Sequence, residues 1–216
     1  MVELSEIAGR AGIAGGAGCL GWVAGRFGRA LVGSLRRGVR APPGWCETSV
    51  AVLWIATALR VGTGGLAPSA AMLPWLLGWW GTLLAVCDLR AARLPDALTG
   101  PAYPVAAVAL AALAWWACAP ALLGGALAGA AVFAGCYALV RLLAPASLGA
   151  GDVKLAGSLG AAVGAVSVPA VPVCVLAAAA LTLVGAILAR GRAVPHGPCM
   201  LAPAWLVTTL LPAAGR

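Results

Sequence analysis

The sequence has 216 residues, of which 62% are hydrophobic and only 9% are charged, and its mean hydropathy is +1.01. Soluble proteins carry about 25% charged residues, so this composition excludes a soluble protein and predicts one that lies in a lipid bilayer. The formal net charge is +8. The basic residues lie between apolar stretches and form no patch with interleaved aromatic residues, so we expect membrane topology, not nucleic-acid binding, to explain them.

Uncharged stretches predict the membrane-spanning helices, because each span needs roughly 20 apolar residues. In chain order these stretches are residues 11–25, 48–59, 66–87, 97–140, 155–189 and 193–215. The first two reach spanning length only if each helix continues past an arginine. Two stretches are long enough for two helices each, with a turn expected at 118–125 and a break at Pro169 and Pro172. The last helix is expected to start after Pro198. The sequence therefore predicts an all-α, polytopic bundle of about eight transmembrane helices.

Arginine and lysine predict which ends of these helices face the cytoplasm. If segment 26–40, with five arginines, is cytoplasmic, alternation of the helices places six more basic residues on the same side. These are Arg90, Arg93, Arg141, Lys154, Arg190 and Arg192. Arg10, Arg60 and Arg216 remain elsewhere, so the positive-inside bias is eleven against three. This orientation places Asp88, Asp96 and Asp152 at the cytoplasmic face.

The sequence contains only six carboxylates, so we sought a structural or functional explanation for each one. Glu3 and Glu6 lie in a polar N-terminal segment, and Glu47 borders the first cytoplasmic loop. Asp96 follows Pro95 at the start of a predicted helix, where aspartate is a favoured N-cap. Two carboxylates, Asp88 and Asp152, remain without such an explanation.

Asp88 ends a predicted span, where the helix dipole disfavours an anion by about 0.3–1 kcal/mol. Its simplest interpretation is an interfacial aspartate paired with Arg90 or Arg93. Asp152 follows Gly149-Ala150-Gly151, and a simple helix N-cap does not require two glycines. If the two carboxylates converge in a cleft, they can share a proton. One can then accept a proton from water as it attacks an amide carbonyl, while the other protonates the carbonyl oxygen. This pattern favours aspartyl proteolysis as a hypothesis.

Two other classes of membrane protein fit the same composition. A small transporter or channel would use intramembrane carboxylates as a proton or cation site, but it should show symmetry between its halves and carboxylates near the midplane. No internal repeat is evident, and the three aspartates lie at span ends. A membrane scaffold without catalytic activity is the third class, and the aspartate pair argues against it. The seven cysteines form no CxxC pair and no cluster with histidine, so no metal site is expected.

Three segments of the sequence resemble motifs of the prepilin peptidases, the type IV leader peptidase family of GxGD aspartyl membrane proteases. The first is Asp88-Leu89-Arg90 with Leu94-Pro95-Asp96-Ala97-Leu98-Thr99, and the second is Gly149-Ala150-Gly151-Asp152-Val153-Lys154-Leu155. The third, Pro195-His196-Gly197-Pro198, is similar to the Pro-Phe-Gly-Pro segment of that family, with His196 in the place of phenylalanine. The resemblance extends from about Glu47 to the C-terminus.

The resemblance implies that Asp88 and Asp152 are the catalytic pair of an aspartic endopeptidase. It further implies motif-supporting roles for Gly149, Gly151, Lys154, Pro95, Asp96, Gly197 and Pro198. The implied reaction removes the leader peptide from prepilin or pseudopilin-like precursors of a type IV pilus or protein secretion system, at the cytoplasmic face of the bacterial inner membrane. Gly149 and Gly151 would let the extended substrate backbone lie against Asp152. The implied partners are these precursors and membrane lipid.

The sequence departs from the long members of the family, which carry a cytoplasmic insertion with two CxxC pairs that bind zinc. Here the corresponding region is only 26–48, with Cys46 as its sole cysteine. Neither zinc nor another cofactor is therefore expected, and the N-methyltransferase activity of many long members is left open. We expect one integral membrane peptidase domain over 1–216, with an N-terminal helix and shortened loop in 1–47 and the peptidase core in 48–216.

Two residues of the motifs have simpler interpretations than catalysis. His196, between Pro195 and Gly197-Pro198, is expected to be structural, with a general-base role as the minor alternative. Lys154 lies two residues after Asp152, on a different face of the predicted helix. We expect it to anchor the chain at the cytoplasmic face, with tuning of the Asp152 carboxyl as the alternative.

Overall fold

The computed structural model describes residues 2–190 and 194–211, and all regular structure within them is helical. The predicted all-α membrane bundle is confirmed, with eight α-helices in the described part of the chain. They are α1 (Val2–Ser34), α2 (Trp45–Gly62), α3 (Met72–Ala91), which follows the short 3-10 helix η1 (Pro68–Ala71), α4 (Asp96–Trp116), α5 (Ala121–Leu143), α6 (Ala150–Val166), α7 (Ala170–Leu188) and α8 (Gly197–Leu210).

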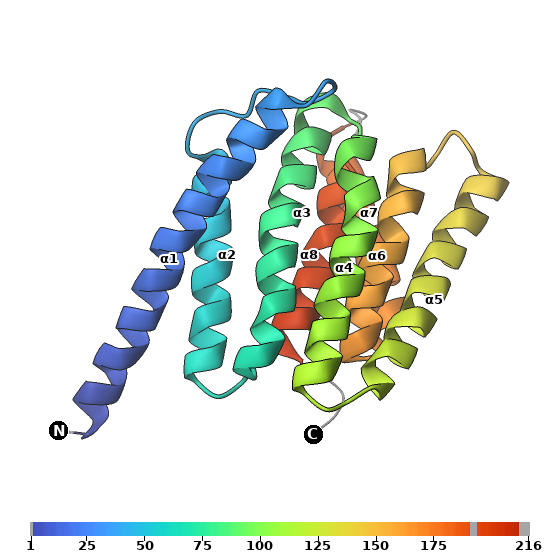
Figure 1. The fold of residues 1–216 in the computed structure, drawn as a ribbon. Helices are drawn as coiled ribbons and strands as arrows, with labels where there is room; N and C mark the ends of the chain where they lie inside the picture. The colour runs from blue at the N-terminus through green and yellow to red at the C-terminus, as the bar shows by residue number, and fades with distance from the viewer. Residues whose placement is uncertain (1, 191–193, 212–216) are drawn as a thin grey trace.

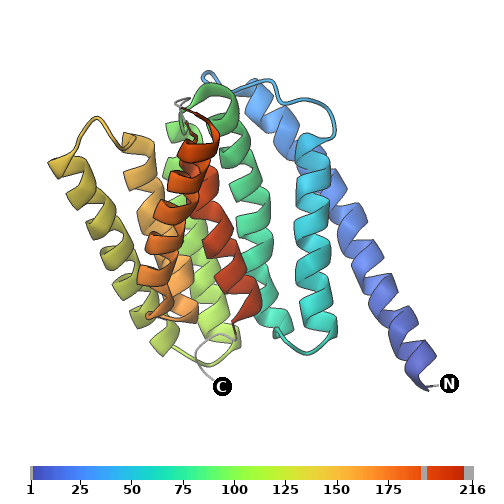
Figure 2. The ribbon, with the colours of Figure 1, turned by 180° about the vertical axis from the view of Figure 1, so that it is seen from behind.

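Successive helices run in opposite directions, so alternate connections lie at the same end of the bundle (Figure 1). The α1–α2, α3–α4 and α5–α6 connections lie together at the end drawn at the top, where α6 and α8 begin; we call it the aspartate end. Helices α7 and α8 form a second layer that is seen in front in Figure 2. Helix α1 lies at the outer edge and packs on α2.

Four helices are long and apolar enough to cross a membrane, as judged by length and composition. These are α3 with η1, α4, α5 and α7. For α1, α2, α6 and α8 the crossing stays a prediction. The protein is thus a membrane protein, since a chain with this many apolar helices must hide them from water.

The breaks between helices follow the proline positions for the most part. Helix α5 begins at Ala121 directly after Pro120, within the predicted turn, and α7 begins at Ala170 directly after Pro169. Pro172, which was predicted to share that break, instead lies in the first turn of α7. The last helix begins at Gly197 and not after Pro198. Proline is tolerated in the first turn of a helix, because the N–H that it lacks would have no partner within the helix there. Helix α3 continues to Ala91 and ends where Ala92 takes a left-handed conformation (φ 48°), so Asp88 lies one turn inside the helix.

Helices α5 and α6 pack through glycines, which corrects the expectation that Gly124 and Gly125 belong to the turn. Both lie inside α5. A Cβ added at Gly125 would lie 2.5 Å from the carbonyl oxygen of Gly164, and one added at Gly129 would overlap the carbonyl oxygen of Gly160. Close approach of helix backbones through small residues is the common packing mode in lipid. The start of α6 is therefore held firmly against α5.

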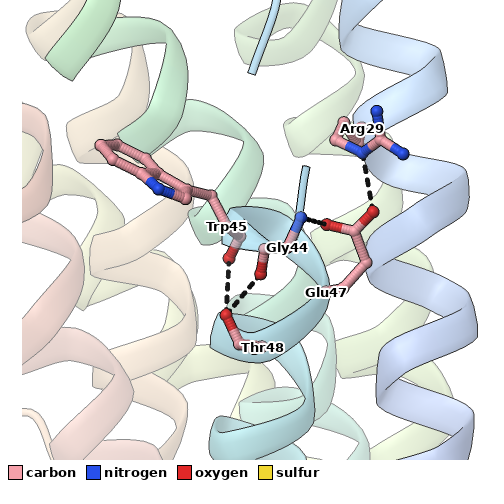
Figure 3. A network of polar contacts seen from close by, with 5 residues as sticks. All are labelled: Arg29, Gly44, Trp45, Glu47 and Thr48. Atoms are coloured by element: carbon pink, nitrogen blue, oxygen red, sulfur yellow. Dashed lines mark hydrogen bonds and ion pairs between the residues drawn. The ribbon is translucent and has the colours of Figure 1, made fainter. Parts of the chain in front are cut away.

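The α1–α2 hairpin buries a carboxylate of its own (Figure 3). Glu47, the third residue of α2, has a relative exposure of 3%. Its Oε1 atom accepts a hydrogen bond from Arg29 Nε at 2.7 Å, and its Oε2 atom accepts one from the Gly44 N–H at 3.0 Å. Gly44 has a φ of 88°, a conformation that favours glycine. Glu47 borders the α1–α2 connection, as predicted, and in addition it forms a buried ion pair that joins α1 to α2.

Candidate active site

Asp88 is buried between α3 and the start of α8, with a relative exposure of 7%. Its Oδ2 atom accepts a hydrogen bond of 2.8 Å from the Gly197 N–H. That N–H is available because the first four N–H groups of a helix have no partner within the helix. A Cβ at Gly197 would lie 2.9 Å from Oδ2, so glycine is the residue that lets the carboxylate reach the backbone there.

Asp152 is the third residue of α6 and has a relative exposure of 8%. Its Oδ2 atom accepts a hydrogen bond of 3.2 Å from the Gly149 N–H. The N-cap of α6 is thus Gly149, and Asp152 reaches back to it from the N3 position, as the acidic residue of a capping box does. A Cβ at Gly149 would lie 2.8 Å from Oδ2. The first glycine of the motif therefore makes room for the carboxylate itself.

Leu94, in the α3–α4 connection, lies between the starts of α6 and α8. A Cβ added at Gly151 would lie 2.8 Å from Leu94 Cβ, and one added at Gly197 would lie 3.4 Å from Leu94 Cδ2. The two glycines thus let three segments that are distant in the sequence meet at one point. Within this chain Gly149 and Gly151 make room for Asp152 and Leu94, which is a packing role that the sequence did not reveal.

The two carboxyl groups lie on either side of Leu94, because Gly197, which binds Asp88, and Gly151, which precedes Asp152, both lie against that residue. Neither forms an ion pair with any residue in 2–190 or 194–211. Arg90 and Arg93 are exposed, so the interfacial pairing considered for Asp88 does not form. Two buried, uncompensated carboxylates from α3 and α6 are unfavourable unless one holds a proton. The structure thus brings together the two aspartates that the sequence singled out.

Asp96 does not cap α4, contrary to the prediction. The N-cap is Pro95, and Asp96 is the first helical residue, without a side-chain cap bond. Its Oδ1 atom instead lies 2.6 Å from Lys154 Nζ in an exposed ion pair. The Tyr103 hydroxyl donates to the Lys154 carbonyl oxygen at 2.6 Å. Lys154 therefore connects α6 to α4, which is more than the anchoring role expected of it.

His196 contacts two residues that the sequence did not single out. Its Nε2 atom lies 2.8 Å from the Tyr137 hydroxyl on α5, and its Nδ1 atom lies 2.6 Å from Thr182 Oγ1 on α7. The sequence contains only two tyrosines, and Tyr137 lies within an apolar stretch. Its rarity in that setting is the signal that could have identified it. Pro198 is the second residue of α8, where it starts the helix beside this network.

An apolar cavity lies between α3, α4, α6 and α8. Leu84 and Leu155 are among its lining residues; Leu84 is one turn before Asp88 in α3, and Leu155 is three residues after Asp152 in α6. The cavity thus begins about one helical turn from both carboxylates. Its other walls include Trp80, Val105 and Leu159.

Comparison with known families decides the assignment. The model of the type IV leader peptidase family matches residues 75–189, which are 115 of the 216 residues. The chain belongs to the type IV leader peptidase family. The matched range contains Asp88, Asp96 and Asp152, so this peptidase carries its buried aspartates within the part that defines the family. No match was found among curated proteins or among solved structures.

Proposed function

We propose that this peptidase is an aspartic endopeptidase that removes the leader peptide from prepilin or pseudopilin-like precursors. The observation that carries the proposal is the pair Asp88 and Asp152, two buried carboxylates without a cationic partner among the described residues. Family membership supports a peptidase. The aspartate pair supports the aspartic mechanism in particular, because proteolysis by two carboxylates requires that they share one proton.

In this mechanism one carboxylate accepts a proton from water as the water oxygen attacks the scissile carbonyl carbon. The other donates its proton to the carbonyl oxygen, and proton transfer to the amide nitrogen then releases the new N-terminus. Each aspartate receives its backbone N–H at Oδ2, which orients the group and leaves Oδ1 to face water and substrate. The proton belongs to the pair, so neither role is assigned to one residue.

The apolar cavity supports a substrate with a hydrophobic segment beside its cleavage site. A precursor whose basic leader precedes an apolar helix would place the leader outside the bundle and apolar side chains among Leu84, Leu155 and their neighbours. Burial of such side chains contributes roughly 1.5–3 kcal/mol each. This gives the enzyme a physical means to place the bond between leader and helix at the aspartates.

We further propose that the aspartate end faces the cytoplasm of a bacterial cell, at the inner membrane, and that residues 1–216 form one peptidase domain with its core in 48–216. Arg90, Arg93 and Arg141 lie near the connections at this end, which supports the orientation by the positive-inside rule. Arg192 and Arg216, which the same prediction used, lie outside the described residues.

Separate Asp88→Asn and Asp152→Asn variants test the proposal. Each is expected to lower leader removal from a co-expressed cognate prepilin by at least about a thousandfold, measured as the shift in precursor size on an immunoblot. Asp96→Asn is the matched control, because Asp96 lies at the same end but is exposed and paired with Lys154; it should keep most of the activity. Normal processing by either single variant would contradict the assignment. Ion or substrate transport without cleavage by the wild type would favour the transporter alternative.

A further inference from the structure

His196 is the only histidine in the sequence, and its ring is held from two sides. The Tyr137 hydroxyl lies 2.8 Å from Nε2, and Thr182 Oγ1 lies 2.6 Å from Nδ1. The Tyr137 and His196 rings also pack together, with centroids 5.5 Å apart. Tyr137 is itself buried on α5. The imidazole therefore bridges α5 and α7 at the point where α8 begins.

The hydrogen bonds define which nitrogen carries the proton. The Thr182 hydroxyl donates to the Ala178 carbonyl oxygen at 2.8 Å, which uses its only hydrogen. Thr182 Oγ1 must then accept from His196 Nδ1–H. In the neutral ring Nε2 is consequently an acceptor, and the Tyr137 O–H donates to it. Both nitrogens of a neutral imidazole are thus satisfied, and burial lowers the pKa of His196, against the opposing charge of Asp88.

The ring is one peptide bond away from the group that binds Asp88. The Gly197 N–H, which follows His196 directly, donates to Asp88 Oδ2 at 2.8 Å. The His196–Gly197 peptide is held at two places: its carbonyl oxygen accepts the Met200 N–H at 3.1 Å in the first turn of α8, and the His196 ring is bound to α5 and α7. Without the ring contacts, only the helix turn would hold the Gly197 N–H on the carboxylate.

We propose that His196 is a positioning residue, which Tyr137 and Thr182 hold so that the Gly197 N–H stays on Asp88. The inference rests on the proposed function, because the orientation of the Asp88 carboxylate matters for cleavage only if Asp88 is catalytic. Both ring nitrogens are occupied by Tyr137 and Thr182. His196 therefore does not take a proton from the attacking water and acts only through Gly197.

A spectroscopic experiment tests the network without any activity measurement. In detergent-solubilised protein labelled with ¹⁵N-histidine, the spectrum contains one imidazole, whose two nitrogens report its tautomer and titration. The expected result is the Nδ1–H tautomer, with a titration midpoint below the ordinary value of 6.5. Tyr137→Phe should raise that midpoint, because it removes the donor to Nε2, and Asp88→Asn should lower it, because it removes a stabilising negative charge. An Nε2–H tautomer, or a ring that does not respond to Tyr137→Phe, overturns the proposal.

Kinetic measurements test the positioning role. His196→Phe restores the residue type of the family motif but cannot form either hydrogen bond. Tyr137→Phe is expected to lower kcat about fivefold with KM nearly unchanged, which corresponds to one lost hydrogen bond. His196→Phe, which loses both hydrogen bonds, is expected to lower kcat at least as much. The double variant should be no worse than His196→Phe alone, since the bond needs both partners. Additive losses, or a change confined to KM, would show that the two residues act separately.

Thr182→Val and Thr57→Val form a matched pair. Each threonine hydroxyl donates to the carbonyl oxygen four residues earlier, to Ala178 and to Leu53. Only Thr182 also contacts His196, so Thr182→Val should lower kcat and Thr57→Val should not. If the wild type cleaves no prepilin, the proposed function fails while the tautomer result still decides the network. If the wild type cleaves and His196→Phe keeps full kcat, the positioning role alone is refuted.

Discussion

Two regions of this membrane peptidase bury carboxylates at the same end of the bundle, and they differ in what compensates the charge. In the α1–α2 hairpin, Glu47 accepts hydrogen bonds from Arg29 and from the Gly44 N–H. Between α3, α6 and α8, Asp88 and Asp152 each accept one backbone N–H. No arginine or lysine in 2–190 or 194–211 pairs with either of them.

The difference shows that ion pairing, and not burial, separates a structural carboxylate from a reactive one. A buried anion with a guanidinium partner keeps its charge and fastens two helices together. Two buried carboxyl groups that share a region without a cation compete for one proton, and that proton is what acid–base catalysis uses. Burial by itself therefore identifies three candidate residues, and the lack of a cationic partner within 2–190 and 194–211 separates the proposed catalytic pair from Glu47.

Among the variants that change the pairing of these carboxylates, the largest effect is expected when a cation is added beside Asp88 and Asp152. Leu94 lies against Gly151 and Gly197 beside Asp88, so Leu94→Arg would bring a guanidinium to the carboxylates and hold both ionised. Cleavage should fall by about two orders of magnitude, measured with the same co-expressed precursor. Leu89→Arg is the control, because Leu89 lies next to Asp88 in the sequence but is 53% exposed. Equal activity of the two variants would show that the missing cation is irrelevant to catalysis.

A smaller effect, on stability, is expected when the paired site loses its cation. Arg29→Met leaves Glu47 buried with one backbone donor and should lower the free energy of unfolding by about 2 kcal/mol, as followed by thermal denaturation in detergent. The double variant Arg29→Met with Glu47→Gln should recover part of this loss. Cleavage per folded molecule should not change.

Asp88→Asn is the matched contrast in the same denaturation experiment. The amide oxygen of asparagine can still accept the Gly197 N–H, so this variant should lose no stability although it loses activity. A large stability loss in Asp88→Asn, or none in Arg29→Met, would break the distinction between the two regions.

The smallest effect is expected for the exposed pair. Lys154 and Asp96 both lie more than half exposed, with side-chain exposures of 53% and 72%, and such pairs contribute little to stability. Lys154→Met should change the melting temperature by less than about 2 °C, and combining it with Asp96→Asn should add nothing. A larger shift would mean that this pair behaves as a buried one, like Arg29 with Glu47.

Much of the fold could be predicted because the bilayer restricts the possibilities. Backbone groups in lipid must be hydrogen-bonded within their own segment, so apolar stretches become helices and prolines mark the breaks. The breaks after Pro120 and Pro169 were predicted for this reason. The predicted N-cap at Asp96 was wrong, since the approach of Lys154 from α6 gives that carboxylate a stronger partner than its own helix start.

The site was predictable in its two central residues but not in its surroundings. Asp88 and Asp152 stood out because carboxylates are rare in this sequence. The packing of Leu94 against Gly151 and Gly197, and the contacts of His196 with Tyr137 and Thr182, join residues that are distant in the sequence, such as Tyr137 and His196, which are 59 positions apart. Such contacts depend on how helices dock, and no local pattern encodes that.

By itself the sequence determined that the protein lies in a membrane and is helical, because an apolar composition requires a lipid environment and backbone groups in lipid must be hydrogen-bonded within helices. It also determined which two aspartates lack an ordinary explanation. Only the tertiary structure decided that Glu47 is paired while Asp88 and Asp152 have no ion-pair partner among the described residues. Pairing requires side chains from different helices to come within hydrogen-bonding distance, and the docking of α1 on α2, and of α8 on α3, sets those distances.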